Sequence, residues 1–212
     1  VTCFESATYA FVFNWTPALT EGATTQPALG RVFATLMLAY TAGSSAFQLL
    51  RARGHSVEPA RQSLGGEMAL ARGVEEPATL LCGALALGPL ALLAPSLALA
   101  MLPLGSASRT GFALFGFVVF EFCCGLYAPS MSAVKGSLVP ERLRSTIYNT
   151  YRVPMNAVVL LVLLSGADTR DTLLCCCGLL ALAAVAGLVL RGRLAEAGAP
   201  AGRPEGAGPR GQ

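Results

Sequence analysis

The chain of 212 residues is 54% hydrophobic and only 13% charged, and its mean hydropathy is positive. A soluble globular domain carries about 25% charged residues, so this composition excludes an ordinary soluble domain and indicates a membrane protein. The net charge is only +3, and the basic residues lie between apolar blocks. We therefore expect no nucleic-acid partner, and we use the basic residues as a guide to membrane topology.

Six apolar segments follow one another along the chain, and each approaches the roughly 20 residues that a helix needs to cross the hydrocarbon core. They predict an all-α protein in the lipid bilayer, with six transmembrane helices at Val1–Leu19, Arg31–Leu50, Ala78–Leu102, Thr110–Ser132, Ser145–Ser165 and Leu173–Leu190. Together these helices make up one transmembrane domain over residues 1–190.

Two stretches are too polar to belong to these helices. Arg51–Pro77 is a polar connection that allows for a short surface helix at Glu67–Arg72. Arg191–Gln212 is rich in Gly, Ala, Pro and Arg and cannot bury apolar surface. We predict that the first is a cytoplasmic connection and the second a disordered cytoplasmic tail.

The placement of Lys and Arg in the connections predicts the orientation. Most of them lie on the same side as Lys135, whereas the opposite side has only Arg31, Arg109 and Arg170. The first side is therefore predicted to be cytoplasmic. Both ends of the chain then face the cytoplasm, which requires an even number of spans.

Six spans with both ends in the cytoplasm fit one half of a major facilitator transporter, which is built from two six-helix halves around a central site. The chain also begins at Val1 inside an apolar run. We therefore expect an N-terminal six-helix half to be missing. A six-span channel subunit would need a helix with regularly spaced Arg or a filter loop, and the sequence has neither.

Two blocks of sequence carry a family resemblance. They comprise Phe4–Tyr9 with Phe11–Leu19, and then Cys124–Met131, Val139–Glu141, Arg144–Ile147 and Asn149–Asn156. In order and separation they resemble the seventh, tenth and eleventh helices of the molybdate-anion transporter family of the major facilitator superfamily. The resemblance covers roughly Phe4 to Leu190, with Asn14 and the long Arg51–Pro77 connection as departures.

The resemblance implies a carrier that takes up molybdate across the cell membrane by alternating access. Two other functions stay open on the sequence alone. The same helices could carry another oxyanion, such as sulfate, or an organic anion. The protein could also be a non-transporting membrane sensor or scaffold, in which the buried charges only hold helices together.

Arg152 is the first candidate for substrate contact, because it lies within an otherwise apolar span. Asn149, Arg152 and Asn156 fall at i, i+3 and i+7, so two amides and one cation share a helical face. A planar guanidinium can donate two charge-assisted hydrogen bonds to a tetrahedral anion, and the amides can add further donors. The alternative is a structural ion pair between Arg152 and a carboxylate such as Glu121.

Two acidic residues are further candidates for the substrate site. Glu121 is centred in a predicted span, where it suits either a proton-coupling carrier or a salt-bridge gate. Glu5 shares a helical face with Tyr9, and we expect both side chains to line a cavity.

The predicted cytoplasmic link between the fourth and fifth spans contains an acidic residue and a basic residue close together, Glu141 and Arg144. The family resemblance implies that Glu141 and Arg144 latch the inward side closed. The alternative is a solvated loop that follows the positive-inside rule.

The sequence predicts no enzyme, no metal site and no cofactor. No nucleophile–base pair or phosphate-binding glycine loop is present, and the consecutive residues Cys175, Cys176 and Cys177 point about 100° apart on a helix, which is unsuited to one metal ion. The small residues from Ala42 to Ala46 predict instead that a neighbouring helix packs closely there.

Overall fold

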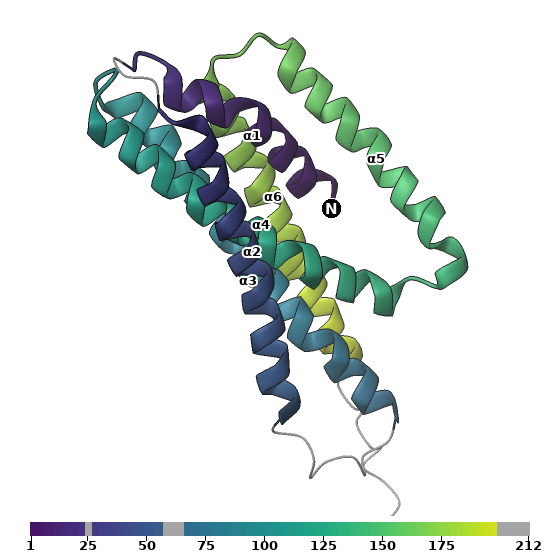
Figure 1. The fold of residues 1–212 in the computed structure, drawn as a ribbon. Coiled ribbons are helices and arrows are strands. Elements are labelled where there is room, and N and C mark those ends of the chain that lie inside the picture. The colour runs from purple at the N-terminus through teal and green to yellow at the C-terminus, as the bar shows by residue number, and fades with distance from the viewer. Residues whose placement is uncertain (24–26, 57–65, 199–212) are drawn as a thin grey trace, which may run out of the picture.

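The structure is a computed structural model that describes residues 1–23, 27–56 and 66–198 (Figure 1). This part of the chain forms six α-helices and no strands. The helices are α1 at Thr2–Thr20, α2 at Leu29–Ser56, α3 at Gly66–Met101, α4 at Ala107–Leu138, α5 at Glu141–Leu164 and α6 at Thr169–Gly198. The predicted all-α membrane fold is confirmed.

Five of these helices, α2 to α6, are long and apolar enough to cross a membrane. α1 has 19 residues and was also predicted as a span, but it does not reach the same hydropathy. Glu5, Asn14 and Pro17 dilute its apolar residues. Each of the six predicted spans is thus a helix in the structure, and five of the six helices meet this criterion.

Several helices extend beyond their predicted ends. α4 continues six residues past Ser132 to Leu138, and its 32 residues correspond to a length of about 48 Å. α2 and α3 both run into the connection predicted at Arg51–Pro77, of which residues 57–65 lie outside the described part. Hydropathy detects where a helix leaves the lipid, not where its backbone hydrogen bonding ends.

The predicted disordered tail needs a similar correction. α6 continues through Arg191 to Gly198, so the first part of that stretch is helical, and residues 199–212 lie outside the described part. The sequence Arg193-Leu194-Ala195-Glu196-Ala197 consists of strong helix formers. An existing helix is extended at low cost by such residues, because the unfavourable nucleation step has already been taken.

The helix contacts repeat between the two halves of the chain. α3 packs on α4 and α6 packs on α1; α2 packs on α4 and α5 packs on α1; α3 and α6 pack on each other. Exchanging α1, α2 and α3 with α4, α5 and α6 therefore reproduces these five contacts, although the small α2–α3 contact has no counterpart of similar size between α5 and α6. Such nested three-helix repeats are a property of each six-helix half of a major facilitator transporter.

α2 and α4 approach each other closely at two glycines. A Cβ atom on Gly125 would clash with the backbone of Tyr40, and one on Gly43 would clash with the backbone of Phe122. The Ser44 hydroxyl also donates to the Gly125 carbonyl over 3.0 Å. The close packing predicted for Ala42 to Ala46 is confirmed, with α4 as the neighbouring helix.

Aromatic side chains fill the space between α1 and α4. The Phe4 ring stacks on Tyr127 at 3.9 Å between centroids, and Phe11 meets Phe117 and Phe120 edge to face at 5.1 and 5.0 Å. All five side chains are buried. This cluster forms the centre of the α1–α4 contact and separates its two ends.

α5 lies at the edge of the bundle next to α1 (Figure 1). Met155 is the one fully buried residue among the described side chains of α5, and its carbonyl accepts a hydrogen bond from the Ser6 hydroxyl at 3.3 Å. Much of the apolar surface of α5, including Val153, Leu160 and Leu161, is exposed in this chain.

Candidate functional site

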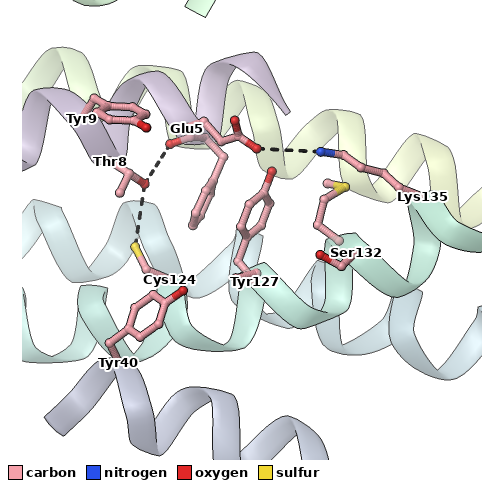
Figure 2. Close-up of a pocket in the computed structure, with 11 residues that line it drawn as sticks. Glu5, Thr8, Tyr9, Tyr40, Cys124, Tyr127, Ser132 and Lys135 are labelled. Atoms are coloured by element: carbon pink, nitrogen blue, oxygen red, sulfur yellow. Dashed lines mark hydrogen bonds and ion pairs between the residues drawn. The ribbon is translucent and has the colours of Figure 1, made fainter. Parts of the chain in front are cut away.

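A cavity of about 310 Å³ lies between α1, α2 and α4 (Figure 2). Its lining consists of aromatic, hydroxyl-bearing and charged side chains: Phe4, Glu5, Thr8, Tyr9, Tyr40, Cys124, Tyr127, Ala128, Met131, Ser132 and Lys135. This size and this mixture of apolar walls with a few polar groups are typical of a small-molecule site.

The charges of the cavity are at one end. The Lys135 ammonium on α4 lies 3.8 Å from the Glu5 carboxylate on α1, with 18% and 34% of their side chains exposed. Lys135 also lies over the rings of Tyr148 and Tyr151 on α5, at 4.9 and 5.8 Å from their centroids. Cation–π contacts of this kind hold the ammonium in place independently of the carboxylate.

The Tyr127 hydroxyl faces these two charges. Figure 2 shows it pointing toward Glu5 and Lys135 from the α4 side of the cavity. Only 6% of the Tyr127 residue is exposed, and its hydroxyl makes no hydrogen bond to the described residues. A buried hydroxyl without a hydrogen-bond partner is unfavourable, and the group that this one faces is the Glu5 carboxylate.

The other end of the cavity is neutral. The Thr8 hydroxyl donates to the Phe4 carbonyl over 3.0 Å and lies 3.7 Å from the Cys124 sulfur. The Tyr40 side chain reaches this end from α2 (Figure 2). The close α2–α4 packing at Gly125 brings Tyr40 here, since Gly125 lies against the Tyr40 backbone.

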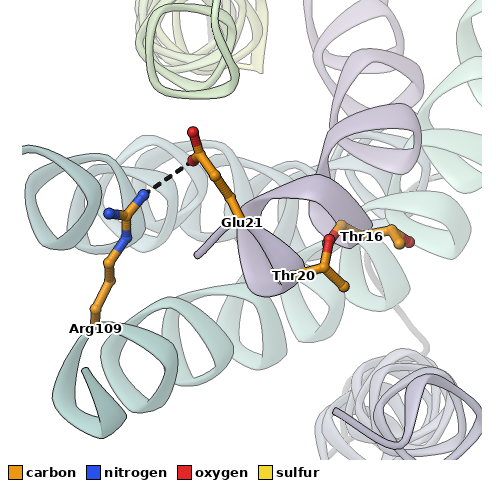
Figure 3. A network of polar contacts seen from close by, with 4 residues as sticks. All are labelled: Thr16, Thr20, Glu21 and Arg109. Atoms are coloured by element: carbon orange, nitrogen blue, oxygen red, sulfur yellow. Dashed lines mark hydrogen bonds and ion pairs between the residues drawn. The ribbon is translucent and has the colours of Figure 1, made fainter. Parts of the chain in front are cut away.

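A second ion pair joins α1 and α4 on the far side of the aromatic cluster. Arg109, near the start of α4, donates to the Glu21 carboxylate at the end of α1 over 3.0 Å (Figure 3). The Arg109 side chain is buried, and its Nε has no hydrogen-bond partner among the described residues. Neither Arg109 nor Glu21 lines the cavity.

The residues predicted from the sequence fall into separate places. Glu5 and Tyr9 line the cavity. Glu121 is buried one turn before Cys124 and does not line the cavity. It forms no ion pair with Arg152.

Asn149, Arg152 and Asn156 are exposed on α5 and do not line the cavity. Arg152 follows Tyr148 by four residues, so it lies one turn along the helical face that contacts Lys135. The structure thus places the predicted cationic face beside the charged end of the cavity, without a contact between Arg152 and its lining.

The predicted gate residues lie in the first turn of α5. Glu141 is exposed there, and the side chain of Arg144 lies outside the described part of the chain.

Sequence reasoning missed Lys135 and Tyr127 as site residues. Lys135 was assigned to a loop because the apolar run ends at Ser132, whereas α4 continues to Leu138 and carries the ammonium along its cavity-facing side. Tyr127, Met131 and Lys135 are spaced four residues apart, and this spacing was the available signal for a shared face.

Comparison with known proteins gives two kinds of match. Residues 1–66 match the model of a family described as sugar transporters with 12 transmembrane helices. The molybdate-anion transporter of Danio rerio is 31% identical over 208 residues, which cover 90% of this chain and 37% of that protein. The molybdate-anion transporter of Xenopus tropicalis is 30% identical over 169 residues, which cover 78% of this chain and 31% of that protein.

A more distant relative is the molybdate-anion transporter of Takifugu rubripes, 26% identical over 76% of this chain and 28% of that protein. The chain thus spans about a third of the length of the curated relatives that it matches. No solved structure matches the chain. The resemblance seen in the sequence is confirmed: the chain is similar over most of its length to proteins named molybdate-anion transporter, and it has an all-α membrane fold consistent with the major facilitator type.

Proposed function

We propose that the full-length protein is a carrier that takes up molybdate by alternating access, and that this chain is its C-terminal six-helix half. The names of the relatives support the substrate. The repeated contacts of the two three-helix units support the architecture. The remaining wall of the substrate path would then come from an N-terminal six-helix half.

The observation that carries this proposal is the position of Lys135. An ammonium within a largely apolar helix bundle is expensive to hold, and such charges mark substrate pathways. Lys135 lines a cavity together with hydroxyl donors on α1, α2 and α4. A tetrahedral dianion can be bound by one cation and several hydrogen-bond donors, which is the set of groups that the cavity offers.

The exposed face of α5 extends this site in the proposal. Asn149, Arg152 and Asn156 would contact the anion from α5 when the second half encloses the path. Arg152 lies one helical turn beyond the Tyr148 ring that Lys135 contacts, which supports a shared cationic region. Glu121, buried behind the neutral end of the cavity, remains a candidate for proton coupling.

The proposed orientation places the Lys135 end of the bundle in the cytoplasm and the Arg109 end outside, in a cell membrane. The uneven distribution of Lys and Arg supports it. Glu141 and Arg144, between α4 and α5, would then lie at the inward side, where we propose that they take part in closing it.

Uptake of molybdate by cells expressing the full-length protein tests the proposal. Lys135→Gln should lower the initial uptake rate more than about tenfold, because one charge-assisted contact to the anion is lost. Arg142→Gln, which removes an exposed cation from the first turn of α5, should leave uptake unchanged at equal surface expression. Arg152→Gln tests the α5 face in the same assay.

The outcomes separate the candidate functions. Uptake that survives Lys135→Gln contradicts the cavity as the substrate site, and uptake that survives Arg152→Gln contradicts the role of α5. Competition by sulfate would show a broader oxyanion carrier. If the wild-type protein at the membrane takes up no molybdate, sulfate or organic anion, the anion carrier is overturned in favour of a sensor or scaffold.

A sugar is the second candidate substrate. The family matched by residues 1–66 is described as sugar transporters, and three tyrosines, Tyr9, Tyr40 and Tyr127, line the cavity. The ion pair at the charged end of the cavity favours an anion over a neutral sugar. Competition of molybdate uptake by an excess of hexose distinguishes them, since only a sugar site would be blocked.

A further inference from the structure

The cation of the cavity already has an anion beside it, the Glu5 carboxylate. We propose that Glu5 is an internal counter-ion that an incoming tetrahedral oxyanion displaces from Lys135, and that the Tyr127 hydroxyl then donates a hydrogen bond to this oxyanion. The inference rests on the proposed function, because it assigns roles within the same cavity.

The Glu5–Lys135 ion pair is weak enough for another anion to replace the carboxylate. Its 3.8 Å separation is longer than the roughly 2.7–2.9 Å of a charge-assisted hydrogen bond between an ammonium and a carboxylate. Glu5 also keeps about a third of its side chain exposed, so water can solvate the carboxylate when it leaves. The free energy lost when Glu5 and Lys135 separate is therefore small compared with the free energy lost on breaking a buried, hydrogen-bonded ion pair.

Lys135 stays in place when the carboxylate leaves. Two aromatic rings of α5, those of Tyr148 and Tyr151, lie beneath its ammonium. The aromatic contacts persist in the absence of Glu5, because the rings belong to a different helix. A cation that keeps its position can accept a second anion in the place of the first.

The Tyr127 hydroxyl supplies the independent observation that points to a ligand. The ring is fixed by stacking on Phe4, and the residue is more than nine-tenths buried. Its hydroxyl is directed at the charged end of the cavity, toward Glu5, and makes no hydrogen bond within 3.5 Å to the described residues (Figure 2). The oxyanion that replaces Glu5 would become the acceptor for this donor.

An oxyanion can bind both groups. Its tetrahedral oxygens can accept from the Lys135 ammonium and from the Tyr127 hydroxyl at the same time. Glu5 and the oxyanion carry the same sign of charge and compete for the same cation. The charged end therefore holds one anion at a time, either the protein's own or the cargo.

Equilibrium binding of sodium molybdate to the purified full-length protein, measured by titration calorimetry, tests this exchange. Glu5→Gln should lower the Kd about fivefold, because the competing carboxylate is gone. Tyr127→Phe should raise the Kd about tenfold, because one donor to a charged ligand is lost. Tyr127→Phe removes only an unpartnered hydroxyl, so it should keep the fold even if Glu5→Gln does not.

Glu21→Gln is the matched control, since it makes the same change at the opposite end of α1 and outside the cavity. It should leave the Kd unchanged. A wild-type protein that binds neither molybdate nor sulfate overturns the proposed function and the exchange with it. Binding in the wild type with an unchanged Kd in Glu5→Gln or in Tyr127→Phe overturns the exchange alone.

Discussion

The two ends of the α1–α4 pair hold their charges in different ways. At the Arg109 end, a buried guanidinium donates to Glu21 over 3.0 Å, and neither residue lines the cavity. At the Lys135 end, the ammonium and Glu5 are 3.8 Å apart and both line it. Each pair joins a carboxylate on α1 to a cation on α4. The role of an ion pair in this bundle therefore depends on the space beside it, and not on the residue types alone.

The internal repeat relates these two ends to each other. Glu5 and Lys135 join the start of α1 to the end of α4, whereas Arg109 and Glu21 join the start of α4 to the end of α1. Exchanging the two helices therefore exchanges the two ends, with the positions of carboxylate and cation reversed.

The largest effect is expected where α4 is fixed between its two ends. Gly125→Ala would drive a methyl group into the Tyr40 backbone, so we expect the free energy of unfolding to fall by about 3 kcal/mol. Thermal unfolding of the purified full-length protein in detergent measures the loss. Gly111→Ala is the matched control in the same helix, because its Cβ would meet no atom within 4 Å. Equal stability of the two variants would contradict the close α2–α4 packing.

A smaller effect should separate the two ion pairs. Glu21→Ala leaves the Arg109 guanidinium buried without its partner, and we expect a loss of about 2 kcal/mol in the free energy of unfolding. Glu5→Ala should lose less than about 1 kcal/mol, because Lys135 keeps its aromatic contacts and has 18% of its side chain exposed, against 6% for Arg109. Unfolding of the two variants in the same detergent measures both values. Equal losses in the free energy of unfolding for Glu21→Ala and Glu5→Ala would contradict the proposed difference between the Arg109 end and the Lys135 end.

Much of the fold could be predicted from the sequence, because lipid imposes a simple length and polarity rule on each helix. The order of the helices and the close approach at Gly43 were predicted and are confirmed. The cavity-lining position of Glu5 and Tyr9 was also predicted, and it follows from their shared helical face.

The rest of the site depends on contacts that hydropathy cannot detect. The sequence predicts Lys135 in a loop, since the end of an apolar run at Ser132 gives no sign that the helix continues to Leu138. The importance of Tyr127 follows only from Glu5 lying opposite on another helix. The polar face of α5 with Arg152 was predictable, but its direction was not, because α5 is held mainly by α1.

The smallest effect concerns α5, which brings the tyrosine rings to the Lys135 end. Ser6→Ala removes the hydrogen bond to the Met155 carbonyl, and we expect a loss of about 0.6 kcal/mol in the free energy of unfolding, as is usual for such bonds between membrane helices. Ser137→Ala is the control, because that hydroxyl bonds only within its own helix and should cost less. A loss in Ser6→Ala as large as that in Glu21→Ala would show that α5 is anchored as firmly as the Arg109 end. The partial exposure of Glu5 and Lys135 would then result from the cavity beside them, and not from weak packing of α5.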